Sequence, residues 1–118
     1  MDIITIIIKG GKTLNKMLQH DLDEKTILNV SQIFKALADP TRIRILNLLC
    51  CDEYSVNEIA TMLGMNQSAV SHQLRLLKSM RIVKFRREGT TMYYSSEDDH
   101  IIQLLHQTID HARHGEKK

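Results

Sequence analysis

The chain has few of the features that would suit it to a membrane or to an oxidising compartment. Its N-terminal apolar run, residues 3–8, is far shorter than the roughly 20 apolar residues of a membrane-spanning helix. It also lacks the basic leader and small-residue cleavage site of an export signal. The only cysteines, Cys50 and Cys51, are adjacent, and a disulfide between neighbours is strained. We therefore expect a cytoplasmic protein that does not contact a membrane.

The chain also has little net charge. Its formal charge of +2 does not by itself indicate a nucleic-acid partner. The distribution is uneven, however, because residues 67–94 contain a single acidic residue, Glu88. The basic residues of this stretch are Arg75, Lys78, Arg81, Lys84, Arg86 and Arg87. We expect a local basic surface there.

The length and composition indicate one soluble domain with one modest core. The chain has 118 residues, of which 42% are hydrophobic and 25% charged, as is ordinary for a globular protein. We assign residues 21–118 to this domain. Residues 1–20 contain Gly10-Gly11 and show no clear period, so they fit a loosely held arm, a short strand or an extension from an upstream start site.

The middle of the chain predicts a helix-turn-helix. A first helix is expected over about 23–37, and Asp39-Pro40 then marks the start of a helix over 41–50, as N-cap and first helical residue. Ser55 and Glu58 fit a capping box that opens a short helix ending at Leu63-Gly64. A longer helix over 67–80 follows a tight turn, with Val70, Leu74 and Leu77 facing inward.

In a helix-turn-helix the N-terminal residues of the second helix meet base edges in the major groove. The corresponding side chains here are short or carry amide, imidazole or guanidinium groups: Gln67, Ser68, Ser71, His72 and Arg75. A helical hairpin that serves packing alone is the alternative, but the exposed face of this helix is unusually polar for that role. We therefore predict that these residues bind double-stranded operator DNA.

A β-hairpin is expected directly after the second helix. Residues 82–86 and 91–95 are β-prone, and they are joined through Arg87-Glu88-Gly89-Thr90, where Gly89 can take the positive φ of a tight turn. The fold class is therefore mainly α with a β-hairpin wing, a winged helix-turn-helix. Lys84, Arg86 and Arg87 of the wing would contact DNA phosphates.

The last part of the chain contains residues that bind metal ions. Residues 100–114 have a helical rhythm, and the helix is expected to start near Asp98 or Asp99. Its apolar stripe would consist of Ile101, Leu105, Ile109 and Ala112. At about 100° per residue, His111 and His114 lie within about 40° of His100 around this helix, whereas His106 lies apart on the surface.

These histidines share a face but not a height. His100 and His111 are separated by roughly 16 Å along the helix, whereas metal ligands lie about 2 Å from a zinc ion. One chain therefore cannot supply all the ligands. If two copies of the helix run antiparallel, Asp98 and His100 of one copy meet His111 and His114 of the other, and a homodimer through its terminal helices contains two sites. Three imidazoles and one carboxylate favour Zn²⁺ or Co²⁺, and Ni²⁺ would need extra ligands or waters.

Two simpler interpretations stay open. Histidines near a chain end are often solvated residues or remnants of a tag, and Cys50 and Cys51 can be buried small hydrophobic residues. Redox sensing or thiolate ligation by the two cysteines is the other interpretation of that pair. A catalytic zinc site, and therefore an enzyme with a small-molecule substrate, is disfavoured because four protein ligands leave no position open for water.

Several segments resemble the ArsR/SmtB family of metal-responsive repressors, over about residues 25–115. They are 34–42 (FKALADPTR), 68–74 (SAVSHQL) and Tyr93-Tyr94 followed by Asp98-Asp99-His100. The C-terminal pattern is similar to that of the CzrA-like zinc and cobalt sensors, whose ligands are one Asp and three His at this spacing. The family's other, cysteine-containing metal box corresponds here to residues 53–57. Ser55 stands where its thiolate would be, which disfavours a site for arsenic, cadmium or lead.

This resemblance implies a dimeric winged-helix repressor of metal-efflux genes that leaves its operator when metal binds. Asp98, His100, His111 and His114 match the family's ligand positions. It also implies a relay in which His111 donates a hydrogen bond to the main-chain carbonyl of His72 on the DNA-reading helix. A redox-responsive repressor of the same family, using Cys50 and Cys51, is the alternative function.

Overall fold

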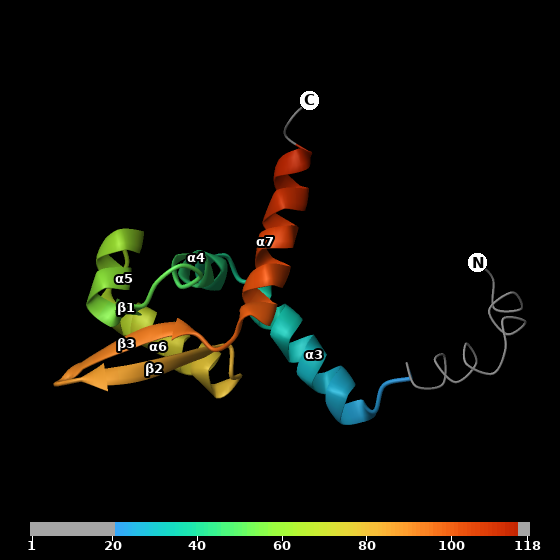
Figure 1. Ribbon diagram of the computed structural model, residues 1–118, viewed down its shortest axis with the longest axis horizontal. Coiled ribbons are helices and arrows are strands. Elements are labelled where there is room, and N and C mark those ends of the chain that lie inside the picture. Colours follow the sequence, from blue (N-terminus) through green and yellow to red (C-terminus); the bar gives the residue numbers. More distant parts are fainter. Residues whose placement is uncertain (1–20, 116–118) are drawn as a thin grey trace, which may run out of the picture. The chain divides into compact units, whose positions relative to one another are not determined.

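The computed structural model describes residues 21–115, whose elements are labelled in Figure 1. The chain separates into two units, residues 1–32 and 33–118, and the predicted arm over residues 1–20 lies outside the described part. In chain order the elements are α3 (Glu24–Leu37), α4 (Pro40–Leu48), β1 (Tyr54–Ser55), α5 (Val56–Leu63), α6 (Gln67–Ser79), β2 (Val83–Glu88), β3 (Thr91–Ser96) and α7 (Asp99–His114). No helix among the described residues is both long enough and apolar enough to cross a membrane.

Side-chain caps set where the first helices begin. The Thr26 N–H donates to Asp23 Oδ1 at 2.7 Å, directly before α3. Asp39 is the N-cap of α4, where its Oδ2 accepts from the Arg42 N–H at 3.0 Å and Pro40 is the first helical residue. A carboxylate suits both positions because the first amides of a helix lack partners within it. The predicted starts of these two helices are confirmed.

The helix-turn-helix is also confirmed. Ser55 and Glu58 form the capping box of α5, each side chain accepting a backbone N–H of the other residue. Gly64 ends α5 with φ +67°, a left-handed conformation that glycine adopts without steric cost. Asn66 then caps α6 by accepting the Ala69 N–H at 2.7 Å. Local chemistry therefore fixes both ends of the turn.

The wing differs in detail from the prediction. β2 continues to Glu88, and Glu88 pairs with Thr91, so that only Gly89 and Thr90 form the loop. The expected four-residue turn over 87–90 is therefore wrong, because a two-residue loop with Gly89 at φ +62° matches the twist of the strands better. The sheet also has a third strand that the sequence did not predict: β1 pairs antiparallel with β3, in the order β1-β3-β2.

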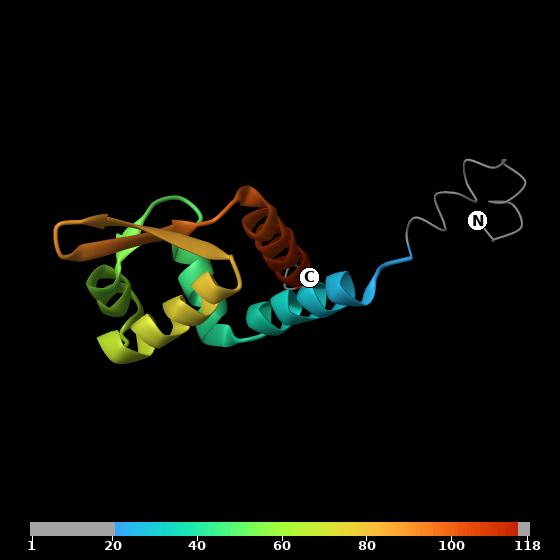
Figure 2. The ribbon, with the colours of Figure 1, turned by 90° about the horizontal axis from the view of Figure 1, so that it is seen from below.

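The core joins the three central helices, the sheet and the start of α7. Ile45, Leu46, Ile59, Val70, Leu74 and Leu77 are fully buried, and the hairpin lies beside α5 and α6 in both ribbon views (Figures 1 and 2). In α7 the prediction of the inward face was partly wrong. Ile102 and Leu105 are buried, whereas Ile101 is only half-buried and Ala112 is exposed. The helix buries its N-terminal half and leaves its last turns in solvent.

The apolar side of α3 is largely exposed. Ile27, Val30 and Phe34 keep 52%, 39% and 56% of their surface accessible, and Ala36 is the buried residue of this helix. These three residues recur at helical spacing, so they form one apolar stripe. The stripe is therefore an exposed apolar surface of this helix.

Candidate DNA-binding and metal-binding sites

The predicted base-reading side chains lie on the outer side of α6. Val70, Leu74 and Leu77 anchor the inner side in the core. On the outer side, Gln67, Ser68, His72 and Arg75 are exposed and Ser71 is half-buried. The helix therefore presents its polar N-terminal half to solvent, in the orientation that a major groove requires. Contact of these residues with DNA stays a prediction.

Three side-chain bonds that the sequence did not predict hold α6 and its neighbours in place. Arg42 Nε on α4 donates to Gln73 Oε1 at 2.8 Å, and Gln67 Nε2 donates to Asn57 Oδ1 on α5 at 2.8 Å. Arg44 donates to the carbonyl oxygen of Leu63 at the end of α5, at 3.2 Å. Each bond joins residues at least ten positions apart, so no local sequence signal announces it.

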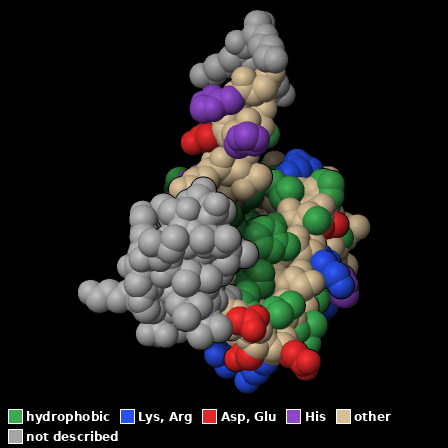
Figure 3. All heavy atoms as spheres, turned by 90° about the vertical axis from the view of Figure 1, so that its right-hand side faces the viewer, with side chains coloured by type: hydrophobic (Ala, Val, Ile, Leu, Met, Phe, Trp, Pro, Cys, Tyr) green, Lys and Arg blue, Asp and Glu red, His purple; other side chains and the backbone are tan. Residues whose placement is uncertain are grey.

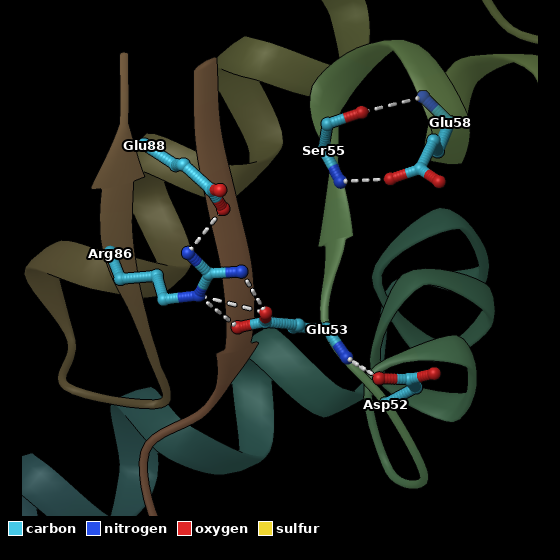
Figure 4. A network of polar contacts seen from close by, with 6 residues as sticks. All are labelled: Asp52, Glu53, Ser55, Glu58, Arg86 and Glu88. Carbon is cyan, nitrogen blue, oxygen red and sulfur yellow. Dashed lines mark hydrogen bonds and ion pairs between the residues drawn. The ribbon is translucent and has the colours of Figure 1, made fainter. Parts of the chain in front are cut away.

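Arg86 on β2, one of the wing residues predicted to contact DNA phosphates, pairs with carboxylates of its own chain. Its Nε lies 2.8 and 2.9 Å from the two carboxylate oxygens of Glu53, and its Nη1 lies 2.8 Å from Glu88 Oε2 (Figure 4). Its guanidinium also lies 4.7 Å from the centre of the Tyr93 ring. The Arg86 hydrogen bonds lower the pKa of the Glu53 carboxyl. The Arg86 guanidinium is thus paired within the chain while half of the side chain stays exposed, and its contact with a phosphate stays a prediction. Lys84 and Arg87 are exposed.

Two hollows, each of about 530 Å³, lie at the two ends of α6. The first lies at its C-terminal end, where Lys78, Arg81 and Lys84 line it together with Glu97. These three cations belong to the basic stretch noted in the sequence, and the fold gathers them at one place. The second hollow lies between the start of α5, Gln67 and residues 90–93 of the wing.

The predicted metal ligands lie at the two ends of α7. Asp98 is the N-cap of this helix, as the prediction required, and its Oδ1 accepts the His100 N–H at 2.9 Å. The same oxygen lies 3.4 Å from His100 Nδ1. His111 and His114 are in the last turn and exposed, and Figure 3 shows histidine side chains standing out on this helix. His106 is exposed as well.

A single chain does not bring these ligands together. Over residues 21–115, no group of three or more His, Cys, Asp or Glu side chains lies close enough to hold a metal ion. A helix of 16 residues is about 24 Å long, so its two ends cannot share one ion. Each end of α7 therefore offers two of the predicted donor side chains, and a site built from all four would need a second α7.

The two cysteines are separate thiols at the end of α4. Their sulfur atoms lie 3.1 Å apart, and Cys50 Sγ lies 2.9 Å from the carbonyl oxygen of Asn47. Cys50 is half-buried and Cys51 exposed. Burial raises the pKa of the Cys50 thiol, and the hydrogen bond with Cys51 raises it further. Cys50 therefore carries less of the reactive thiolate than an ordinary cysteine at neutral pH.

In the segment that corresponds to the family's cysteine-containing box, the side chains have structural roles. The Ser55 hydroxyl, which is 8% exposed, serves the capping box of α5 together with Glu58. Glu53 is bound by Arg86. Glu53, the single carboxylate of this segment, and Glu58 directly after it thus have partners within the chain, and a hydroxyl is a poor ligand for soft metals.

Comparison with known proteins finds relatives that are described as regulators of transcription. Residues 39–84 match the family model described as "Bacterial regulatory protein, arsR family". A transcriptional repressor SmtB homolog of Synechocystis sp. is 41% identical over 87 residues, which cover 74% of this chain and 66% of that protein. A cadmium resistance transcriptional regulatory protein CadC homolog of Staphylococcus aureus is 38% identical over 96 residues, covering 80% and 79%.

The structures agree as well. The homodimeric winged helix-turn-helix DNA-binding domain Mb0332 of Mycobacterium bovis superposes with a TM-score of 0.71 at 38% identity, covering 80% of this chain and 89% of that domain. These relatives are transcriptional regulators rather than enzymes. The winged helix-turn-helix that the motifs predicted is therefore confirmed both by the fold and by its neighbours.

Proposed function

The chain belongs to the ArsR family of bacterial regulatory proteins, and we propose that it is a dimeric, cytoplasmic repressor that Zn²⁺ or Co²⁺ releases from operator DNA, controlling metal efflux. The observation that carries the metal part is the placement of four exposed donors on α7. Asp98 and His100 are at its start and His111 and His114 at its end. These are the types and the number of ligands that zinc and cobalt accept.

Dimerisation is supported by two observations. The apolar stripe of α3, with Ile27, Val30 and Phe34, is exposed in the single chain, and monomeric proteins rarely leave such surfaces uncovered. The similar Mb0332 domain is homodimeric. We propose that the terminal helices meet in a two-fold interface, where antiparallel copies of α7 place the start of one beside the end of the other.

The proposed regulation follows from this geometry. A dimer binds its operator when its two copies of α6 are spaced about one DNA turn apart, roughly 34 Å. Ligands drawn together from two chains would alter this spacing. By linkage, metal and DNA would then each weaken binding of the other, typically by about 5- to 150-fold. We propose that His111 transmits the change by donating its second ring N–H to the main-chain carbonyl of His72.

The test is a titration of the protein–operator complex with Zn²⁺, Co²⁺ and Ni²⁺ in turn, followed by fluorescence anisotropy at constant ionic strength. Constant salt matters because DNA affinity depends steeply on it. We expect zinc or cobalt to weaken operator binding and to do so no longer in His111→Ala. A wild-type complex that tolerates all three metals would exclude metal-dependent release while leaving repression itself intact.

A redox-responsive repressor is the second candidate. It is favoured by the 3.1 Å separation of the Cys50 and Cys51 sulfur atoms. The raised pKa of Cys50 argues against it, because disulfide formation proceeds through the thiolate. Release of operator by diamide, together with indifference to zinc, would favour this candidate over the metal sensor.

A further inference from the structure

Asn57 of α5 holds the first side chain of the DNA-reading helix. Gln67 Nε2 donates to Asn57 Oδ1 at 2.8 Å, and both residues are exposed. Asn57 is the second residue of α5 and Gln67 is the first of α6. The bond therefore links the two helices of the helix-turn-helix at the end where such helices meet base edges.

This bond determines which way the Gln67 amide faces. Because Asn57 Oδ1 is an acceptor, the nitrogen of the Gln67 amide is turned toward α5. The amide nitrogen has two N–H groups, and the bond uses one. One N–H donor and the carbonyl oxygen of Gln67 remain. Adenine presents the matching pair in the major groove, an N7 acceptor beside an N6 donor.

The surroundings leave this pair undisturbed. Ser55 and Glu58, which flank Asn57 in the sequence, are engaged with each other in the capping box. The hollow of about 530 Å³ between α5 and residues 90–93 of the wing keeps the amide pair open to solvent. Asn57 thus has Gln67 as its side-chain partner at a surface open to a ligand.

We infer that Asn57 is a positioning residue for base readout: it orders the Gln67 amide before DNA arrives, so that Gln67 selects adenine in each half-site. This inference rests on the proposed DNA-binding function. Ordering a long side chain on binding costs about 0.5–1.5 kcal/mol, or roughly 2- to 10-fold in affinity. Because Asn57 already orders the Gln67 side chain in the free protein, this loss of affinity is avoided. The effect is confined to the base that Gln67 contacts.

The test is a selection of sequences from a pool of randomised 30-base-pair duplexes, with the full chain and its variants. The wild type should enrich a motif with adenine at one position of each half-site. Gln67→Ala should relax the preference at that position by about 5- to 150-fold. Asn57→Ala should relax the same position by about 2- to 10-fold, and the double variant should match Gln67→Ala alone.

Two further variants separate positioning from a general effect. Asn57→Asp keeps an acceptor for Gln67 Nε2, so its base preference should be retained while all sequences bind more weakly, because the new charge repels phosphates. Thr61→Ala, an exposed change further along α5, should leave the preference intact. Full preference in Asn57→Ala, or equal relaxation in Asn57→Asp and Asn57→Ala, would overturn the inference. A wild type that enriches no motif would instead contradict the proposed DNA-binding function.

Discussion

Arg86 and Glu53 tie the wing to the body of the domain from positions 33 residues apart in the sequence. The Arg86 guanidinium contacts both oxygens of the Glu53 carboxylate and lies over the ring of Tyr93, which is on the strand between them. Because Glu53 directly precedes β1, the contact reaches from β2 across β3 to the start of β1. Arg86, which was predicted to contact DNA, thus also helps to hold the hairpin against the rest of the domain.

This contact should make stability depend on pH. Hydrogen bonds from Arg86 lower the pKa of Glu53 below its ordinary value of 4.5. A carboxyl group with a lowered folded-state pKa stabilises the fold above its unfolded pKa, and that stabilisation is lost as the pH falls through the folded pKa. Glu53→Gln should therefore unfold at a lower temperature than the wild type at neutral pH, and the difference should disappear as the pH falls through the lowered folded-state pKa of Glu53.

Circular dichroism melts at a series of pH values measure this difference. The exposed Asp110→Asn is the matched control, because Asp110 makes no ion pair with another residue of the described part of the chain, and its melt should differ little from the wild type at every pH. A Glu53→Gln deficit that stayed constant from neutral to acid pH would show that the carboxylate charge is not what stabilises the wing.

Ser55 should contribute through its cap. Its hydroxyl accepts the Glu58 N–H at 3.1 Å, and removing an N-cap side chain typically costs about 0.5–2 kcal/mol. Ser55→Ala should lower the free energy of unfolding by that amount, and Ser55→Thr should restore most of it. Urea titrations give the values. If Ser55→Ala had the same free energy of unfolding as the wild type, the capping box would not contribute to stability.

The local elements could be predicted from the sequence because their signals are local. Asp39-Pro40, Ser55 with Glu58, and Gly64 each satisfy or end a helix through bonds within a few residues. β1 has only two residues, too few to show a period, and it exists because Tyr54 and Ser55 pair with Tyr94 and Tyr93, far along the chain. The length of β2 was missed because the loop closes on two residues rather than four.

In the candidate sites, too, features set by local spacing could be predicted, whereas contacts between separate elements could not. Helical spacing was enough to place Asp98 and His100 at one end of α7 and His111 and His114 at the other. Spacing did not reveal that Glu53 binds Arg86 or that Asn57 binds Gln67, since each pair joins separate elements. Alternation along β2 puts Lys84 and Arg86 on one face, but only the fold shows which of them has an acidic partner.

The apolar stripe of α3 should be needed for dimerisation. Phe34 is 56% exposed in the single chain, and placing a charge there would oppose burial in an apolar interface. Phe34→Glu should sediment as a monomer at concentrations where the wild type is a dimer. Met62→Glu is the matched control, since Met62 is 50% exposed and belongs to a different helix, α5. A dimeric Phe34→Glu would place the interface elsewhere.

Cys50 and Cys51 should be dispensable for the metal response. Because burial and the neighbouring thiol raise the pKa of Cys50, it should react with iodoacetamide more slowly than a free cysteine. The double variant Cys50→Ser/Cys51→Ser should still release operator when zinc is added, with an unchanged midpoint. Loss of the zinc response in this variant would bring thiolate ligands into the site and contradict the Asp and His assignment.

Mixed dimers give the sharpest test of a metal site shared between chains. One variant lacks the start of the site, Asp98→Ala/His100→Ala, and the other lacks its end, His111→Ala/His114→Ala. Neither homodimer can assemble a complete site if each site takes one end of α7 from each chain. A mixed dimer, however, regains one complete site, because the first chain supplies His111 and His114 and the second supplies Asp98 and His100.

The visible absorption of Co²⁺ reports the outcome, because tetrahedral cobalt absorbs strongly. Each variant alone should show no such band, and mixing them after unfolding and refolding together should restore up to one site per mixed dimer. If all ligands came from a single chain, no mixture would show the cobalt band, since each chain lacks half of its own ligands. Recovery on mixing therefore separates a site between two chains from any arrangement within one, independently of whether the protein binds DNA.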